Sequence, residues 1–145
     1  MTMIVCDTDF LMKVTNEPIP KLRQMLQSSE YELVAIPSVL RELKGLASSS
    51  NQKTARYARN ALRAVEDKLV LSKVGASPAP KTEADIAILD FALNQVESVL
   101  VATLDGTLLS ELESRRVSYL TLRNDRPFTR EFDRATYLTT KKRRS

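Results

Sequence analysis

The stretch "VATLDGTLLS" (residues 101–110) joins a short apolar run to an acid and then to leucines at helical spacing. An apolar run of this length, bounded by polar residues, is typical of a strand that is buried on both faces. The residues that follow, 106–115, have the pattern of a helix. Asp105 therefore falls at a junction between a strand and a helix, and its role at that junction is the first question.

The same alternation runs along the whole chain. Strands are expected at 3–6, 31–37, 68–74, 98–104 and 117–122, and helices at 9–14, 19–29, 38–47, 53–66, 83–96 and 106–115. Strands that alternate with helices predict an α/β fold, here three α/β/α layers around a central, mainly parallel sheet of four or five strands. Ser38 is the expected N-cap of the helix that follows the second strand. The helix at 83–96 is apolar on nearly all sides and should be buried.

Length and charge suggest one domain with a basic extension. A chain of 145 residues suits a single core, predicted over residues 1–122. Residues 123–145 hold eight basic and three acidic side chains, whereas the remainder holds 14 and 15. This extension is expected to be partly disordered, and its "KKRRS" end is either a nonspecific RNA contact or a solubility feature.

Composition excludes several classes of protein. No apolar run approaches the roughly 20 residues that cross a bilayer, and the N-terminus does not resemble a signal peptide. The single cysteine, Cys6, is expected in the core and fits a cytoplasmic protein. With no histidine and one cysteine, a zinc site is close to excluded, so any metal must be held by oxygen.

Residues 101–107 resemble the Asp-x-Asp-Gly-Thr string of the aspartate-nucleophile phosphatases. In that family the first acid attacks phosphate, but Thr103 stands at this position. A threonine hydroxyl needs an adjacent base, and the chain has no histidine to provide one. The string therefore has to be interpreted with the other acids of the chain.

Four acids stand at informative places, and each also has a purely structural interpretation: Asp7, Glu42, Asp85 and Asp105. Asp7 and Asp105 could cap helices, Asp85 could complete a capping box with Thr82, and Glu42 could be a solvated residue. Because parallel strands end at one edge of a sheet, Asp7 and Asp105 should nevertheless emerge together, with Asp85 nearby. Carboxylates gathered in this way need a cation or a proton, and an oxygen-only cluster suits Mg²⁺ or Mn²⁺.

The segments "IVCDTDFL", "IPSVLRELKGL", "KTEADIAILDFA", "VATLDGTLLSEL" and "VSYLTL" occur in an order that resembles the PIN-domain nucleases over about residues 3–122. The small stand-alone archaeal and ribosomal-RNA-processing branch is the most similar, with the nucleases of toxin–antitoxin pairs close behind. The resemblance implies a parallel sheet and a metal-dependent ribonuclease activity. A PIN-like module without catalysis is the alternative.

By this resemblance, the catalytic residues are expected to be Asp7, Glu42, Asp85 and Asp105. Asp7, Asp85 and Asp105 would be metal ligands, and Glu42 a ligand or the group that orients the attacking water. Thr103 would hydrogen-bond a carboxylate or a water on the metal, and Asp9 stands where asparagine is common in the family. Asp90 is the other candidate for the role given to Asp85.

A basic stripe suggests contact with RNA. Residues 43–65 contain no acid, and four basic side chains recur there at three- and four-residue steps: Lys53, Arg56, Arg59 and Arg63. They share one side of a helix with Tyr57 nearby, which suits a phosphate-binding surface, although a solvated helix face is the commoner explanation. The apolar Leu22, Met25 and Leu26 would suit a homodimer. An antitoxin or a pre-ribosomal particle is a further expected partner.

An acidic-pocket phosphoacceptor domain is a third candidate class, because "DTD" follows the first strand. Such domains need a lysine after the last strand, where this chain has Arg123. The sequence does not specify the RNA substrate, the cleavage position or the number of metal ions.

Overall fold

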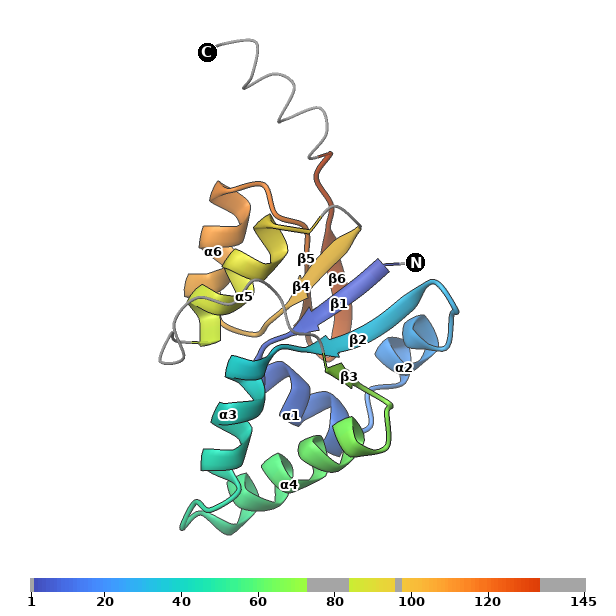
Figure 1. The fold of residues 1–145 in the computed structure, drawn as a ribbon. Coiled ribbons are helices and arrows are strands. Elements are labelled where there is room, and N and C mark those ends of the chain that lie inside the picture. The colour runs from blue at the N-terminus through green and yellow to red at the C-terminus, as the bar shows by residue number, and fades with distance from the viewer. Residues whose placement is uncertain (1, 73–83, 96–97, 134–145) are drawn as a thin grey trace.

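A computed structural model describes residues 2–72, 84–95 and 98–133, which form one six-stranded sheet with helices on both sides (Figure 1). The strands are β1 (Thr2–Cys6), β2 (Tyr31–Ala35), β3 (Leu71–Ser72), β4 (Val99–Ala102), β5 (Tyr119–Arg123) and β6 (Arg126–Arg130). The helices are α1 (Thr8–Asn16), α2 (Pro20–Leu26), α3 (Pro37–Leu46), α4 (Gln52–Glu66), α5 (Ala84–Leu93) and α6 (Gly106–Ser114). The predicted α/β class with a mainly parallel sheet is confirmed.

The order of strands in the sheet is β3-β2-β1-β4-β5-β6, and the first five strands are parallel. β1 lies at the centre, where Ile4, Val5 and Cys6 are completely buried. The predicted core position of Cys6 is therefore confirmed, and burial raises the pKa of its thiol to about 12. Strands buried on both faces explain the nearly continuous apolar runs in the sequence.

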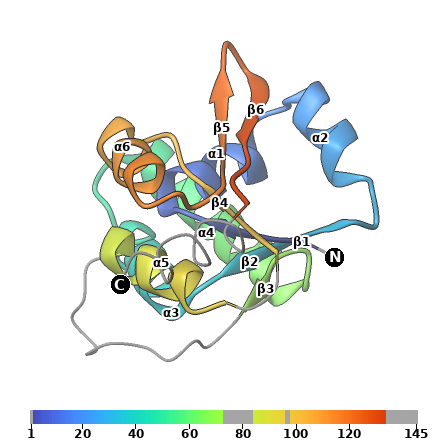
Figure 2. The same ribbon diagram turned by 90° about the horizontal axis from the view of Figure 1, so that it is seen from above.

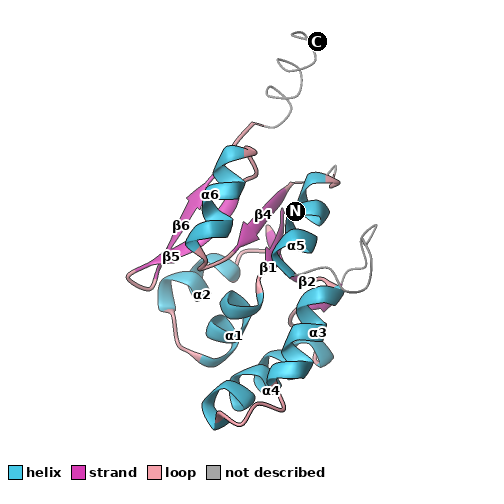
Figure 3. Cartoon of the chain, turned by 90° about the vertical axis from the view of Figure 1, so that its left-hand side faces the viewer, coloured by secondary structure: helices cyan, strands magenta, loops and turns pink. Residues whose placement is uncertain are grey.

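The helices α1, α3 and α4 pack against one another beside the sheet, and Figure 3 shows α1 and α4 side by side. Alanines at three-residue steps form the buried face of α4: Ala55, Ala58, Ala61 and Ala64. The Asn16 side chain joins the two helices, because its Nδ2 donates to the Tyr57 carbonyl at 2.9 Å and its Oδ1 accepts from Asn60 Nδ2 at 2.7 Å. The opposite face of α4 is left for charged side chains.

The sheet has six strands where four or five were expected, because β6 adds an antiparallel edge strand to β5. Figure 2 shows these two strands side by side as a hairpin. Its two-residue turn, Asn124 and Asp125, has φ angles of 53° and 57°, which asparagine and aspartate tolerate better than most residues. The predicted boundary at residue 122 falls inside this hairpin, within β5. The end of the extension, residues 134–145, lies outside the described residues.

Several local predictions are also corrected. Ser38 is not an N-cap: α3 begins at Pro37, Ile36 is its cap residue, and Ser38 is buried in the first turn. Proline suits this first position because it lacks the N–H that would remain unpaired there. The third strand begins at Leu71 and not at residue 68, and the end predicted at residue 74 lies outside the described residues. The helix α5 is not buried on all sides, since Ile86 is 56% exposed. The proposed capping residue Thr82 lies outside the described residues.

Two broader expectations can be compared with the structure. Leu22 is buried, so it is not available to a dimer interface, and Met25 and Leu26 pack partly against the core. The prediction that Leu22 contributes to a homodimer interface is therefore wrong. None of the helices in the described part of the chain is both long enough and apolar enough to cross a membrane.

Candidate metal centre

The order in which the chain adds strands to the sheet reverses between β1 and β4. From β1 the chain first builds β2 and β3 on one side, and it later returns to add β4 and β5 on the other. Ligands of open α/β sheets bind beyond the carboxyl ends of the strands at such a reversal. Asp7 follows β1 directly, and its backbone N–H donates to the Ala102 carbonyl at the end of β4 at 2.8 Å. The two strand ends are thus held together where a site is expected.

A cavity of about 320 Å³ opens at this edge and is lined almost entirely by acids. Its lining residues are Asp7, Asp9, Glu42, Ala84, Asp85 and Asp105. They come from the ends of β1 and β4 and from the helices α1, α3 and α5. We call this cavity the acid pocket. It brings together all four acids predicted to be catalytic, together with Asp9.

Asp90 does not line the acid pocket. It lies one and a half turns further along α5, where its Oδ1 accepts from Asn94 Nδ2 at 3.4 Å. Between the two acids considered for this helix, the structure therefore places Asp85 in the pocket.

Asp7 is both the N-cap of α1 and part of the pocket wall. Its Oδ1 accepts from the Thr8 N–H at 2.7 Å, and its Oδ2 accepts from Thr103 Oγ1 at 2.8 Å. Desolvation raises the pKa of this carboxyl, the two hydrogen bonds lower it, and the charges of Asp9 and Asp105 raise it further. The net shift is upward, as expected for an acid among like charges.

Thr103 connects the two strand-end acids. Its hydroxyl is completely buried, donates to Asp7 Oδ2 and accepts from the Asp105 N–H at 3.1 Å. Asp105 is the N-cap of α6, and its Oδ1 accepts from the Thr107 N–H at 3.0 Å. The predicted hydrogen bond from Thr103 to a carboxylate is therefore present. The capping roles considered for Asp7 and Asp105 are present too, so each acid has both a structural function and a place in the pocket.

Glu42 extends from α3 to the rim of the pocket and is largely exposed. Its pKa is raised, first by desolvation through partial burial and then by the charges of Asp7, Asp9 and Asp85. The Thr8 hydroxyl is close enough to favour the ionised form of Glu42. That hydroxyl is buried and has no hydrogen-bond partner among the described residues. Thr8 was not predicted from the sequence as a site residue, although its position between Asp7 and Asp9 indicated one.

Asp85 lies in the first turn of α5 and is half-buried. Its Oδ1 accepts from the Ile86 N–H at 3.0 Å. Like the other pocket acids, it takes part in no ion pair within the described residues; the ion pairs found there join Lys13 to Glu17 and Asp125, Arg115 to Glu111, and Arg130 to Glu113. The pocket is therefore an anionic site in which no basic side chain of the described segments balances the charge.

The carboxylates share a cavity but stand apart. Within residues 2–72, 84–95 and 98–133, no three acids are grouped closely enough to hold a metal ion as they stand. A donor set made only of carboxylate and hydroxyl oxygens suits a hard divalent ion such as Mg²⁺ or Mn²⁺.

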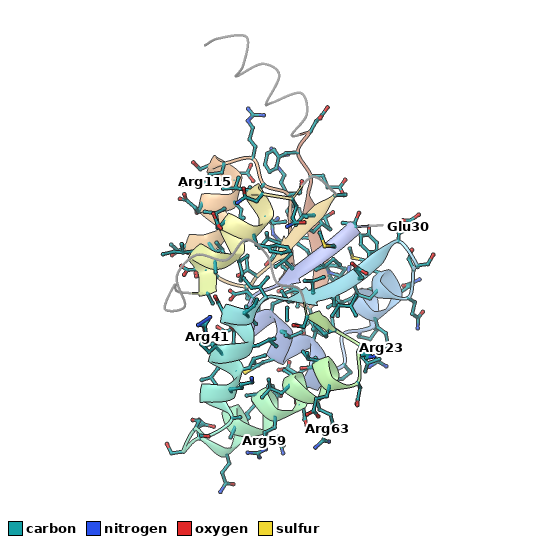
Figure 4. All side chains as sticks on the ribbon, in the orientation of Figure 1. Arg23, Glu30, Arg41, Arg59, Arg63 and Arg115 are labelled. Atoms are coloured by element: carbon teal, nitrogen blue, oxygen red, sulfur yellow. The ribbon has the colours of Figure 1, made fainter. Side chains whose placement is uncertain are left out.

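The basic stripe of α4 does not reach the acid pocket. Lys53, Arg56, Arg59 and Arg63 are all exposed, and none of them lines the pocket. Figure 4 shows Arg59 and Arg63 pointing away from the body of the protein. Lys53 lies 5.3 Å from the centre of the Tyr57 ring. If the stripe binds RNA, it does so at a distance from the acids.

Comparison with known proteins gives matches in structure but not in sequence. No protein-family model and no curated protein matches the chain. The solved structure of the PIN domain endonuclease Utp24 is similar over 90% of this chain and 92% of that chain, with a TM-score of 0.64 and 20% identity. The chain has a PIN-domain fold. A second similar structure is a domain of a functionally unknown protein from Methanocaldococcus jannaschii DSM 2661, at a TM-score of 0.58 and 16% identity over 85% of this chain and 92% of that one. At these identities the similarity shows the PIN-domain fold alone.

Proposed function

We propose that this protein is an endoribonuclease that depends on Mg²⁺ or Mn²⁺. The observation that carries the proposal is the acid pocket: five carboxylates from four segments of the chain line one cavity where the strand order reverses, and no basic residue of the described segments pairs with them. Similarity to a PIN domain endonuclease supports a nuclease activity. Capping alone would not need such a cluster, because serine or asparagine caps a helix equally well.

The donor atoms fit a divalent ion. Asp85 and Asp105 each use only Oδ1 in hydrogen bonds to described residues, which leaves Oδ2 available on both. Each oxygen of Asp7 accepts one bond and has a second lone pair. We assign Asp7, Asp85 and Asp105 as the ligands of this ion. When bound, the ion supplies charge neutralisation at the phosphate and acidification of a water molecule.

The remaining residues hold the site in shape. Thr103 fixes the orientation of Asp7 through its hydrogen bond and ties it to the backbone of Asp105. Glu42, at the rim, is placed to orient the attacking water or to serve as a further ligand. Asp9 adds negative charge and so favours capture of a cation. The buried hydroxyl of Thr8 is a hydrogen-bond donor beside Glu42.

RNA is the proposed substrate, and the exposed basic residues of α4 are a second surface for it. The role in the cell would be either ribosomal-RNA processing or that of a toxin nuclease, with a pre-ribosomal particle or an antitoxin as partner and the cytoplasm as location. Mapping the cleavage positions on total cellular RNA separates these roles, because the two predict different target RNAs.

The test is cleavage of total cellular RNA by the purified protein with Mn²⁺, compared with EDTA. Asp7→Asn and Asp105→Asn should each abolish cleavage, while asparagine keeps both helices capped and the protein folded. Cleavage that continues in both variants, or in EDTA, would contradict the proposed site. Loss of cleavage in both variants, purified in the same way, also shows that the wild-type activity does not come from a contaminating nuclease.

The spacing of the carboxylates favours one alternative, a non-catalytic PIN-like protein that binds RNA or acts as a scaffold. Titration with Mn²⁺ distinguishes the two. A nuclease site should bind the ion and lose that binding in Asp7→Asn and Asp105→Asn, whereas a scaffold has no need to bind it through these acids.

A further inference from the structure

A second groove, of about 680 Å³, lies between α6 and the β5–β6 hairpin. Leu104 is one of its lining residues and stands between Thr103 and Asp105 in the chain. The groove wall therefore includes a residue of the segment that carries Asp105 into the acid pocket. Its volume falls within the range of about 300–1,000 Å³ that is usual for ligand sites. This groove was not predicted from the sequence, because β6 falls in the extension that was expected to be partly disordered.

One face of the hairpin combines aromatic and basic side chains. Side chains alternate along a strand, so Tyr119 and Arg123 of β5 share a face. Their partners across the hairpin are Arg130 and Arg126, and Phe128 lies between these two on β6. Arginines interleaved with aromatic residues are a feature of surfaces that bind single-stranded nucleic acid.

The central feature of this face is a stack of Arg123 on Phe128. The guanidinium carbon of Arg123 lies 3.7 Å from the centre of the Phe128 ring. Within the described residues, Arg123 makes no ion pair with an acid. The ring therefore supports a planar cation whose other face can stack with a second flat group.

One acid, Glu113, lines the groove, and its charge is balanced by a basic side chain. Arg130 Nε donates to Glu113 Oε1 at 3.3 Å, and the Tyr119 hydroxyl donates to Glu113 Oε2 at 3.0 Å. Both carboxylate oxygens are thus engaged by donors. These two contacts hold the Glu113 side chain in place. Among the described residues, the arginines of the hairpin that form no ion pair are then Arg123 and Arg126.

We propose that this groove binds a base of single-stranded RNA beside the acid pocket, with the base stacked on the Arg123 guanidinium that rests on Phe128. The proposal rests on the function proposed above, since it concerns the RNA that the acid pocket would cleave. The stack favours RNA over an acidic peptide, because a peptide carboxylate binds the N–H edge of a guanidinium and not its face. Arg126 is then close to the phosphates that flank the bound base.

Binding experiments in EDTA test the groove without any need for cleavage. The affinity of the full-length protein is measured for a short single-stranded RNA and for the same backbone with abasic residues in place of the bases. The wild-type protein should prefer the RNA with bases by about fivefold or more, the lower end of what one stacked base contributes. Arg123→Ala should lose this preference, and Arg123→Lys should lose it too, because lysine keeps the charge but offers no plane.

Arg126→Ala is the matched control. It removes the same charge from the neighbouring position of the hairpin. It should therefore weaken the binding of both RNAs and leave the ratio of the two affinities unchanged. A ratio that is the same in wild type, Arg123→Ala and Arg126→Ala would overturn the proposal. So would a polyglutamate competitor that binds the wild-type protein, releases the RNA and loses its affinity in Arg123→Ala, because that result assigns the groove to an acidic protein partner.

The outcomes separate the two proposals. A base preference that depends on Arg123, in a protein that never cleaves RNA, would support the groove and reject the nuclease. Cleavage that is lost in Asp7→Asn, together with a base preference that is indifferent to Arg123, would support the nuclease and reject the groove. Thermal unfolding of each variant confirms that the hairpin is folded during the measurement.

Discussion

Thr103 and Asp7, which are 96 positions apart in the sequence, are joined by a hydrogen bond of 2.8 Å between the ends of two neighbouring strands. The bond is buried on the threonine side and reaches the acid pocket on the aspartate side. The same hydroxyl also accepts from the Asp105 N–H. One small side chain therefore sets the geometry of both strand-end acids.

Thr103→Val should destabilise the protein. The substitution keeps the shape but removes a buried hydroxyl that both donates and accepts, so the free energy of unfolding should fall by about 1–3 kcal/mol. Thr103→Ser is the control, because it retains the hydroxyl and should restore Mn²⁺-dependent cleavage even where its stability is reduced by loss of the methyl group. Urea unfolding measures the first effect. A valine variant with full activity would contradict the positioning role of Thr103.

The raised pKa values of Asp7 and Glu42 predict how stability changes with pH in the absence of divalent ions. Between the ordinary values, 3.8 for aspartate and 4.5 for glutamate, and the higher values in the folded state, the folded protein binds more protons than the unfolded chain. These two groups therefore lower the free energy of unfolding as pH rises through that window. Asp7→Asn removes one of them, so the variant should gain stability relative to wild type as pH rises.

Urea unfolding of both proteins in EDTA, from about pH 4 to about pH 7, measures that difference. Glu42→Gln should show a difference of the same sign, since the cause is shared. A wild-type protein that gains stability over Asp7→Asn with rising pH would show that the carboxyl is stabilised in its charged form and would contradict the prediction.

Mn²⁺ should stabilise the folded protein, because an ion that binds only the folded state shifts the unfolding equilibrium. At an ion concentration of 100 times Kd the gain is about 2.7 kcal/mol, or roughly 5–10 °C in Tm for a domain of this size. Asp85→Asn should lose most of this shift. Asp90→Asn, on the same helix but outside the acid pocket, should keep it. The reverse result would move the metal ligand from Asp85 to Asp90.

Neutralising the basic stripe should weaken RNA binding. Arg56→Gln with Arg59→Gln removes two exposed charges of α4, so the slope of log K against log salt should become shallower by about 1.4. Lys21→Gln with Arg23→Gln, on α2, removes the same charge elsewhere and serves as the control. An unchanged slope in the α4 variant would assign the stripe to solubility.

Much of the acid pocket was predictable because topology places it. Once β1 and β4 are recognised as parallel neighbours, Asp7 and Asp105 must emerge at one edge, whatever the details of packing. The choice between Asp85 and Asp90 was not predictable in the same way. Both acids lie on one helix, and only its rotation and docking decide which side chain faces the pocket.

The hairpin was missed for a physical reason. β6 reads "RPFTR", a charged segment with a proline, and it lies on the surface, where no apolar pattern is needed. Its pairing with β5 depends on a two-residue turn, Asn124 and Asp125, that lacks the glycine usual in such turns. The Arg123–Phe128 stack exists only when both strands are in register, so no local pattern in the sequence could reveal it.

The strand β6 also influences how the protein behaves at high concentration. Pro127 has no N–H to offer to a neighbour, and the charged Arg126 and Arg130 flank it along the outer edge of the sheet. A charged margin of this kind discourages the sheets of separate molecules from joining edge to edge. Replacing the proline and arginines of β6 with threonine or valine would therefore be expected to promote fibrous aggregation.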